Sequence, residues 1–222
     1  METFNEESHF DEFEKYDVIT DQDIFTKIWT QPKRIFKYIN EKQYEKYLYT
    51  LLFLEGIAKS FDRAVSKNMG ENSSLFFILF VSIILGGFLG WISYYIYAAL
   101  LSWTGKWLDG KGNTSSIFRM MAYAMMPSIL SLVFLIPQII IHQENAFTSA
   151  EYDSGNDFVD IFSSVFSLIG GVLSLFSFVL IVIGLSQVQK FSIGKAIINL
   201  LLPIAVIVVP ILLIVFLAGG FN

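Results

Sequence analysis

The chain of 222 residues contains no cysteine and only two histidines. Without cysteine it has no disulfide bonds, no zinc–thiolate centre and no thiol nucleophile. The two histidines, His9 and His142, lie far apart without ligand-like spacing around them, which disfavours a metal site built on imidazole. We therefore expect no bound metal and no cofactor.

Charged residues are also scarce, at 16% of the chain, whereas a soluble domain carries roughly 25%. The mean hydropathy is +0.57, and the apolar residues run in long uncharged blocks rather than in the periodic pattern of a soluble core. This distribution excludes an ordinary soluble domain and predicts a helical integral membrane protein.

Five segments are candidates for crossing the bilayer, because a helix needs about 20 apolar residues to do so. Four of them are uncharged blocks, whereas residues 44–65 include Glu55, Lys59, Asp62 and Arg63 and on their own would equally suit a surface helix. We predict an all-α integral membrane protein, a five-helix transmembrane bundle with a cytoplasmic amphipathic N-terminal segment. The expected spans are about 44–65, 75–102, 120–141, 161–187 and 196–218, within a transmembrane domain of residues 47–222.

The charges between the spans decide in favour of five. Cytoplasmic loops carry an excess of Lys and Arg, and five spans put the basic residues before the first span, in the second loop (106–119) and in the fourth loop (190–195) on one side. The third loop, 141–160, has five acidic residues and no Lys or Arg. This layout predicts a cytoplasmic N-terminus and an external C-terminus.

The cytoplasmic N-terminal region divides into two parts by charge. Residues 1–23 carry nine acidic residues and one lysine, the composition of a disordered acidic tail. Residues 24–46 carry six basic and two acidic residues, with Pro32 suited to the first turn of a second short helix. We predict amphipathic helices at 24–46 that lie on the membrane surface; packing on the bundle's own loops is the alternative. The expected membrane-surface residues are Ile24, Phe25, Ile28, Lys33, Arg34, Phe36 and Lys37.

Within the first span, Glu55, Lys59 and Asp62 follow one another at i, i+4 and i+7 and form a candidate polar cluster. A carboxylate near mid-depth costs on the order of 2.5–3.5 kcal/mol on insertion scales, so it is expected to face the bundle and to pair. The cluster is either an ion or substrate contact, or a Glu55–Lys59 pair that offsets its own burial.

Small residues recur every four positions in two spans. Ser82, Gly86 and Gly90 in the second span, and Ser163, Ser167 and Gly171 in the fourth, predict close approach of neighbouring helices. No phosphate-binding loop, nucleophile elbow or acid–base pair occurs in the sequence, so we expect no catalytic residues and no enzymatic activity.

Three stretches together resemble the Yip family of Ypt/Rab-interacting membrane proteins, in its bacterial branch. They are DIFTKIWTQPKRIFKYI, WTGKWLDGKGNTSSIFRMMAYAMMPSI and GLSQVQKFSIGKAIINLLLP, and the resemblance covers about residues 24–218. It implies five spans and a cytoplasmic N-terminus. Eukaryotic members are associated with small GTPases and with vesicle formation, but their Asp-Leu-Tyr-Gly-Pro motif is absent here, so GTPase binding is not carried over. The matching residues form a candidate cytoplasmic-face motif of Trp29, Pro32, Gly110, Lys111, Gly112, Arg119, Tyr123, Pro127, Gly194 and Lys195, for which we expect structural roles.

Two functions remain open. The first is a non-enzymatic membrane protein that organises lipid or protein partners at its cytoplasmic face. The alternative is a small-solute, ion or lipid transporter or channel that uses the Glu55, Lys59 and Asp62 cluster. Expected partners are the bilayer, anionic lipids at the cytoplasmic face, a protein bound by the N-terminal segment and further copies of the chain, but no nucleic acid. The expected location is the bacterial cytoplasmic membrane, or the Golgi and endoplasmic reticulum if the source is eukaryotic.

Overall fold

The computed structural model describes residues 19–148 and 156–217, and every regular element in these two ranges is helical. Residues 1–18 of the expected acidic tail (residues 1–23) lie outside the described residues. Residues 149–155 of the expected third loop lie outside them as well. The elements are α2 (Asp21–Lys27), α3 (Pro32–Glu41), α4 (Leu48–Ser66), α5 (Met69–Asn72), α6 (Leu75–Phe80), the π-helical turn η1 (Val81–Gly86), α7 (Gly87–Lys106), α8 (Thr114–Ala124), α9 (Met126–His142), the 3-10 turn η2 (Gln143–Phe147), α10 (Asp157–Gln189) and α11 (Ile193–Leu217).

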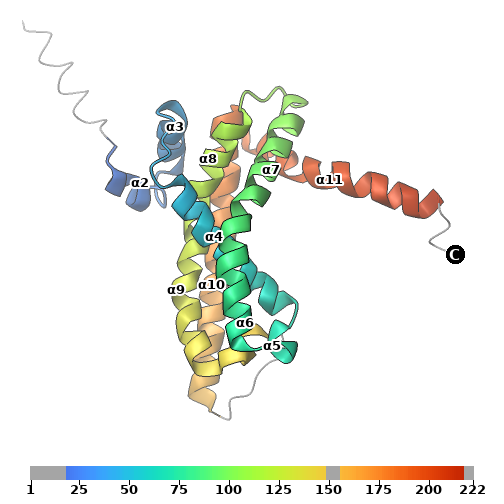
Figure 1. The fold of residues 1–222 in the computed structure, drawn as a ribbon. Coiled ribbons are helices and arrows are strands. Elements are labelled where there is room, and N and C mark those ends of the chain that lie inside the picture. Colours follow the sequence, from blue (N-terminus) through green and yellow to red (C-terminus); the bar gives the residue numbers. More distant parts are fainter. Residues whose placement is uncertain (1–18, 149–155, 218–222) are drawn as a thin grey trace, which may run out of the picture.

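The long helices α4, α7, α9 and α10 run side by side in a bundle, and α8 continues the line of α9 (Figure 1). Within the described ranges, four continuous helical stretches are long and apolar enough to cross a membrane: Leu75–Lys106, Thr114–Phe147, Asp157–Gln189 and Ile193–Leu217. They contain four of the five expected spans. The fifth, α4, has 19 residues, about 28 Å of helix, but its charged side chains set it apart in composition.

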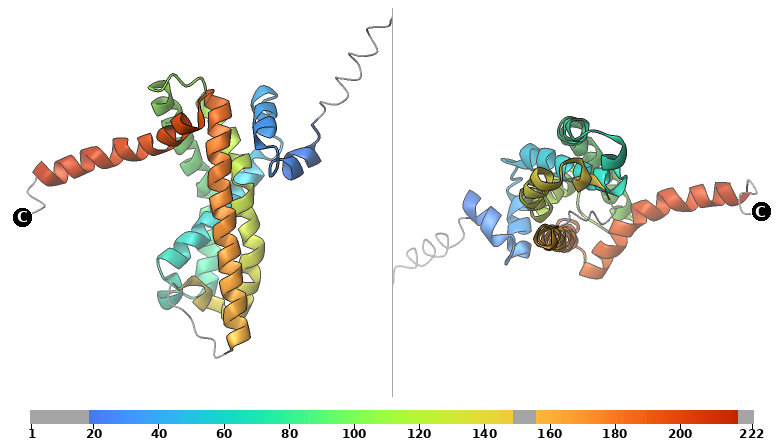
Figure 2. Two further views of the ribbon diagram at one scale, coloured as in Figure 1. Left: turned by 180° about the vertical axis from the view of Figure 1, so that it is seen from behind. Right: turned by 90° about the horizontal axis from the view of Figure 1, so that it is seen from below.

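The last helix departs from the expected bundle. α11 leaves the top of the bundle and extends sideways from it (Figure 2). Only its first part is packed, with Ala196, Asn199, Leu200 and Pro203 buried. From Ile204 onward its large apolar side chains are exposed. The packed bundle therefore consists of α4 and the first three apolar stretches, and α11 contributes only its beginning.

The N-terminal helices α2 and α3 lie at the end of the bundle where the α7–α8 connection is drawn (Figure 1). Thr20 and Asp23 cap the start of α2 reciprocally, and Pro32 begins α3 as expected. The first helix starts at Asp21, slightly earlier than the predicted boundary of the amphipathic segment. The short elements α5 and η2 lie at the opposite end, so residues 33–46 and the described part of the expected third loop are at different ends of the bundle.

The helices α4 and α7 meet through glycine, as the small residues of the second span predict. A Cβ built on Gly56 of α4 would lie 2.2 Å from the carbonyl oxygen of Gly86, and one built on Gly90 would lie 2.6 Å from Cα of Gly56. No larger residue fits these three positions unless the helices separate. The second predicted stripe differs, because Gly171 of α10 has open space around it among the described residues.

Candidate functional site

Glu55 lies in the middle of α4 and is wholly buried. Its Oε1 accepts hydrogen bonds from the hydroxyls of Tyr94 on α7 and Ser128 on α9, both at 3.2 Å. Its Oε2 has no hydrogen-bond partner among the described residues. The expectation that this carboxylate faces the bundle is therefore confirmed, and three helices converge on it.

Lys59 lies between the two carboxylates of the predicted polar cluster. Its Nζ is 4.0 Å from Oε1 of Glu55 and 3.0 Å from Oδ2 of Asp62. Asp62 itself is exposed. The cluster thus joins a buried acid to an exposed one through a half-exposed cation, so the ion pair extends from the bundle interior to its surface.

At the other end of the bundle, the predicted Gly-Lys-Gly motif forms the connection between α7 and α8. The N–H of Gly112 donates a 2.9 Å hydrogen bond to Oε1 of Gln189, at the end of α10, and the N–H of Lys111 donates to the Gln189 carbonyl. A Cβ on Gly110 would lie 2.4 Å from the same Oε1. The two glycines are therefore needed for close approach to α10, while the Lys111 side chain is exposed.

A buried amide network extends from Gln189. Its Nε2 donates to Leu101 and to Asn199 Oδ1, both at 3.2 Å, and Asn199 Nδ2 donates to Thr104 Oγ1 at 2.9 Å. Gln189, Asn199 and Thr104 are all fully buried. They join α7, α10 and the start of α11, and satisfy polar groups that would otherwise be costly to bury.

The second Gly-Lys pair of the motif lies at the start of α11. Lys195 Nζ donates to the carbonyl of Leu108 at 3.1 Å and is 3.8 Å from Oδ2 of Asp109. Beyond its chain neighbours and the backbone of its own helix, no described residue lies within 4 Å of a Cβ built on Gly194. Lys195 therefore links α11 to the α7–α8 connection, whereas Gly194 has no steric requirement in this structure.

The remaining motif residues lie near the α8–α9 and α2–α3 regions. Arg119 is buried and donates to Oε1 of Glu45 at 2.7 Å. The hydroxyl of Tyr123 accepts a 3.4 Å hydrogen bond from the N–H of Tyr47, and the ring of Trp29 stacks on Phe176 with centroids 5.4 Å apart. Pro127 is buried at the start of α9, and Pro32 begins α3. Trp29 thus joins the α2–α3 region to α10, and Arg119 and Tyr123 join α8 to the segment that leads into α4.

Asp21 is an anchor that was not among the predicted site residues. Its carboxylate accepts hydrogen bonds from Tyr44 at 2.6 Å and from Tyr47 at 3.2 Å, and it pairs with Lys46. The hydrogen bond from Lys46 is the largest of the effects that hold the pKa of Asp21 below its usual value, followed by the one from Tyr44. These contacts connect α2 to the segment that enters α4.

The expected membrane-surface residues divide into two groups in the structure. Ile24, Ile28 and Phe36 are fully buried against the bundle, whereas Phe25 is half-buried and packs on the same cluster. The structure thus matches the alternative of packing on the bundle for the apolar side chains. The cationic group is exposed: Lys33, Arg34 and Lys37.

Gln189, Asn199 and Asp21 are the principal residues that sequence reasoning missed. A signal existed for Asn199, because it is a polar residue within an otherwise apolar stretch, whereas Gln189 lies at the polar end of its span beside Gln187 and Lys190. No group of three or more His, Cys, Asp or Glu residues in the described ranges is arranged to hold a metal ion. The polar groups found here hold helices together, and one carboxylate, Glu55, retains an unused oxygen.

Comparison with known proteins gives one family. No curated protein and no solved structure matches the chain. The model of the Yip1 domain matches residues 26–214, which include α3 to α10 and almost all of α11. The resemblance of the three sequence stretches to the Yip family is thereby confirmed at the level of the family, and the chain belongs to the Yip1 domain family.

Proposed function

We propose that the protein is a non-enzymatic, five-span membrane protein that uses a rigid cationic platform at its cytoplasmic end to hold anionic membrane surfaces or acidic protein partners. The N-terminus is cytoplasmic and the C-terminus external in this proposal. The bacterial cytoplasmic membrane is the expected location. The platform consists of the exposed cations of α3, Lys33, Arg34 and Lys37, together with Lys111.

The observation that carries the proposal is the burial of one face of α3 beneath an exposed basic face. Ile35, Phe36 and Ile39 are at most 1% exposed, so the helix is fixed on the bundle and cannot turn its apolar side outward without losing that packing. Its cations consequently point away from the protein. A fixed array of cations binds an anionic surface with less loss of conformational entropy than a flexible basic tail.

The charge distribution supports the orientation. The α3 platform and the α7–α8 connection lie at one end of the bundle. The other end includes the acidic residues Glu71, Glu144 and Asp157, together with the cations Arg63 and Lys67 of the α4 C-terminus. Basic residues are retained on the cytoplasmic side of membrane proteins. The same distribution favours α4 as a fifth span, because α4 begins next to the platform and ends near α5.

The test is vesicle binding by the full chain in nanodiscs of neutral lipid. Vesicles that contain anionic lipid should bind, and neutral vesicles should not. Each lysine near an anionic surface contributes about 1 kcal/mol, so Lys33→Gln with Lys37→Gln should weaken binding on the order of thirtyfold. Higher salt should weaken it as well.

The matched control preserves charge at the same positions, as Lys33→Arg with Lys37→Arg, and should bind like the parent. Equal binding of neutral and anionic vesicles would contradict the lipid form of the proposal. Unchanged vesicle binding by the glutamine variant would show that the cations of α3 are not the binding platform.

A second candidate function, transport of a small solute, ion or lipid, is favoured by one observation. Glu55 is buried between α4, α7 and α9, and its Oε2 has no partner in the part of the chain that the structure describes. A buried carboxylate with free acceptor capacity is a default ion or proton contact inside a membrane. Flux in proteoliposomes that is lost in Glu55→Gln, while the variant remains folded, would favour transport over the scaffold.

A further inference from the structure

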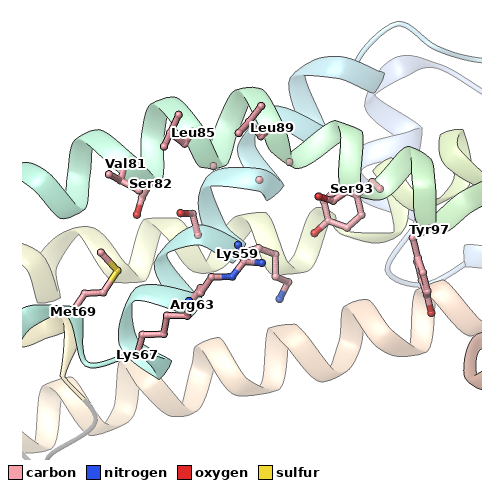
Figure 3. Close-up of a pocket in the computed structure, with 15 residues that line it drawn as sticks. Lys59, Arg63, Lys67, Met69, Val81, Ser82, Leu85, Leu89, Ser93 and Tyr97 are labelled. Carbon is pink, nitrogen blue, oxygen red and sulfur yellow. The ribbon is translucent and has the colours of Figure 1, made fainter. Parts of the chain in front are cut away.

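A groove of about 610 Å³ runs along one side of the bundle between α4 and the helix formed by η1 and α7 (Figure 3). Its lining extends from Val81 to Tyr97 along that helix, about 24 Å at 1.5 Å per residue. Gly56, Gly86 and Gly90 make the close helix contact within it. The groove has the volume of a site for a small organic ligand.

One end of the groove is cationic. Lys59, Arg63 and Lys67 follow at i, i+4 and i+8 on α4 and at its C-terminal cap, and their side chains lie next to one another in the close-up (Figure 3). Lys59 pairs with Asp62 and approaches Glu55. Arg63 and Lys67 are exposed and form no ion pair with any described residue.

The middle of the groove is suited to a hydrocarbon chain. Leu85 and Leu89 line it beyond the cations, and Ser60 and Ser82 provide hydroxyls near the cationic end. The π-helical turn η1 forms part of this wall, and such turns are frequent at ligand sites. The lining therefore has cations and hydroxyls at one end and leucine side chains along its middle, and beyond them it includes the hydroxyl-bearing Ser93, Tyr94 and Tyr97.

The position of the groove indicates which kind of ligand it can bind. One wall belongs to Leu75–Lys106, a helix long and apolar enough to span a membrane, so the groove opens where lipid is present. The cations lie toward the end of the bundle opposite α3, near the α4–α5 junction. Cations at membrane depth are costly unless an anion or water meets them. An amphiphile with an anionic head satisfies both the cationic end and the apolar middle of the groove.

We propose that this groove binds one anionic glycerophospholipid from the leaflet opposite the α3 platform. Its phosphate lies between Arg63 and Lys67, the glycerol esters lie near Ser60 and Ser82, and one acyl chain runs along Leu85 and Leu89. Guanidinium and ammonium groups donate the charge-assisted hydrogen bonds that a phosphate accepts. The proposal goes beyond the cytoplasmic platform, because it concerns different residues at the other end of the bundle.

The experiment is native mass spectrometry of the full chain, purified in mild detergent and titrated with phosphatidylglycerol or phosphatidylcholine. The parent should retain one phosphatidylglycerol and prefer it over phosphatidylcholine by about tenfold, the effect of a charge-assisted contact. Arg63→Gln with Lys67→Gln should lower phosphatidylglycerol retention by about the same factor. Arg63→Lys with Lys67→Arg should restore it.

Two controls separate this site from other binding. Lys42→Gln with Lys106→Gln makes the same charge change at exposed positions outside the α3 platform, toward the opposite end, and should leave the retained lipid unchanged. Glycerol 3-phosphate carries the head without the chains and should not displace it from the parent. Equal retention by the Arg63 and Lys67 glutamine variant, equal binding of the two lipids, displacement by glycerol 3-phosphate, or a lipid-free dimer that buries the groove would each overturn the proposal.

Discussion

Gly112 and Gln189 are 77 residues apart in the sequence, yet the N–H of one donates a 2.9 Å hydrogen bond to the side chain of the other. The contact holds the α7–α8 connection against the end of α10. Gln189 also donates to Leu101 and Asn199. A single amide thus satisfies one donor and two acceptors in a buried position, and its loss leaves all of them without this partner.

Gln189→Leu should therefore lower the stability of the protein. Each buried polar group left unsatisfied costs about 1–3 kcal/mol, so the melting temperature in detergent should fall clearly. Gln187→Leu is the matched control, because Gln187 is half-buried in the same helix and its side chain makes no hydrogen bond with any described residue. A similar fall in both variants would mean that the amide network contributes nothing specific.

Glu45→Gln should destabilise the junction between α4 and α8. Arg119 is 4% exposed and donates to Glu45 through both Nε and Nη2. Because the Glu45 side chain is 54% exposed, we expect a cost of about 1–2 kcal/mol, below that of breaking a fully buried pair. Glu45→Gln should melt at a lower temperature than Glu41→Gln, the control, which removes an exposed carboxylate 3.9 Å from Lys37. Identical melting of the two variants would count against the buried pair.

Gly56→Ala should force α4 and α7 apart. Its Cβ would lie 2.2 Å from the backbone oxygen of Gly86, and backbone cannot move aside as a flexible side chain can. Overpacking of this kind costs about 1–3 kcal/mol. Gly171→Ala, at a helical position with open space, should be neutral or slightly stabilising. Unfolding in denaturant measures both, and a neutral Gly56→Ala would show that the helices do not meet through these glycines.

The start of α2 should loosen in acid. The salt bridge from Lys27 and the hydrogen bonds from Thr20 hold the pKa of Asp23 at about 2, below its ordinary 3.8. Because the folded value is the lower one, the contribution of this carboxylate is complete above pH 3.8 and is lost as the pH falls toward 2. The protection factors of residues 21–30 in hydrogen exchange, which correct for the pH dependence of intrinsic exchange, should fall over this interval. In Asp23→Asn the protection should be low already at neutral pH and vary less with acid; an unchanged acid dependence of the protection factors would exclude Asp23 as its source.

Much of the helical layout could be predicted from composition alone, because uncharged blocks of this length have few other environments. Lipid and protein interiors are both apolar, however. The pattern of apolar residues therefore does not distinguish a helix face that contacts lipid from one that packs on the bundle. The apolar face of Ile24, Ile28 and Phe36 is compatible with a membrane surface, but it packs on the bundle. The same ambiguity applies to α11, whose apolar residues predict a span without specifying which helices it contacts.

Small residues show a related limit. Gly86 and Gly90 predicted a close approach that is confirmed by their contacts with Gly56. Ser163, Ser167 and Gly171 have the same spacing, yet Gly171 contacts no other helix at close range. A small side chain permits two helices to come together but does not require it. The hydrogen bond between Gln189 and Gly112 could not be predicted from the sequence either, because the two residues are 77 positions apart and meet only in the folded chain.

The wide turn of Val81–Gly86 changes how this helix tolerates a shorter sequence. A π-helical turn holds more residues than the α-helical turn that would replace it. Removal of one residue elsewhere in a helix swings everything beyond it by about 100°. Within Val81–Gly86 the deletion can instead be absorbed by tightening the turn, which leaves Gly90 facing α4. This segment is therefore the place in the second span where natural variation in length is most easily accommodated.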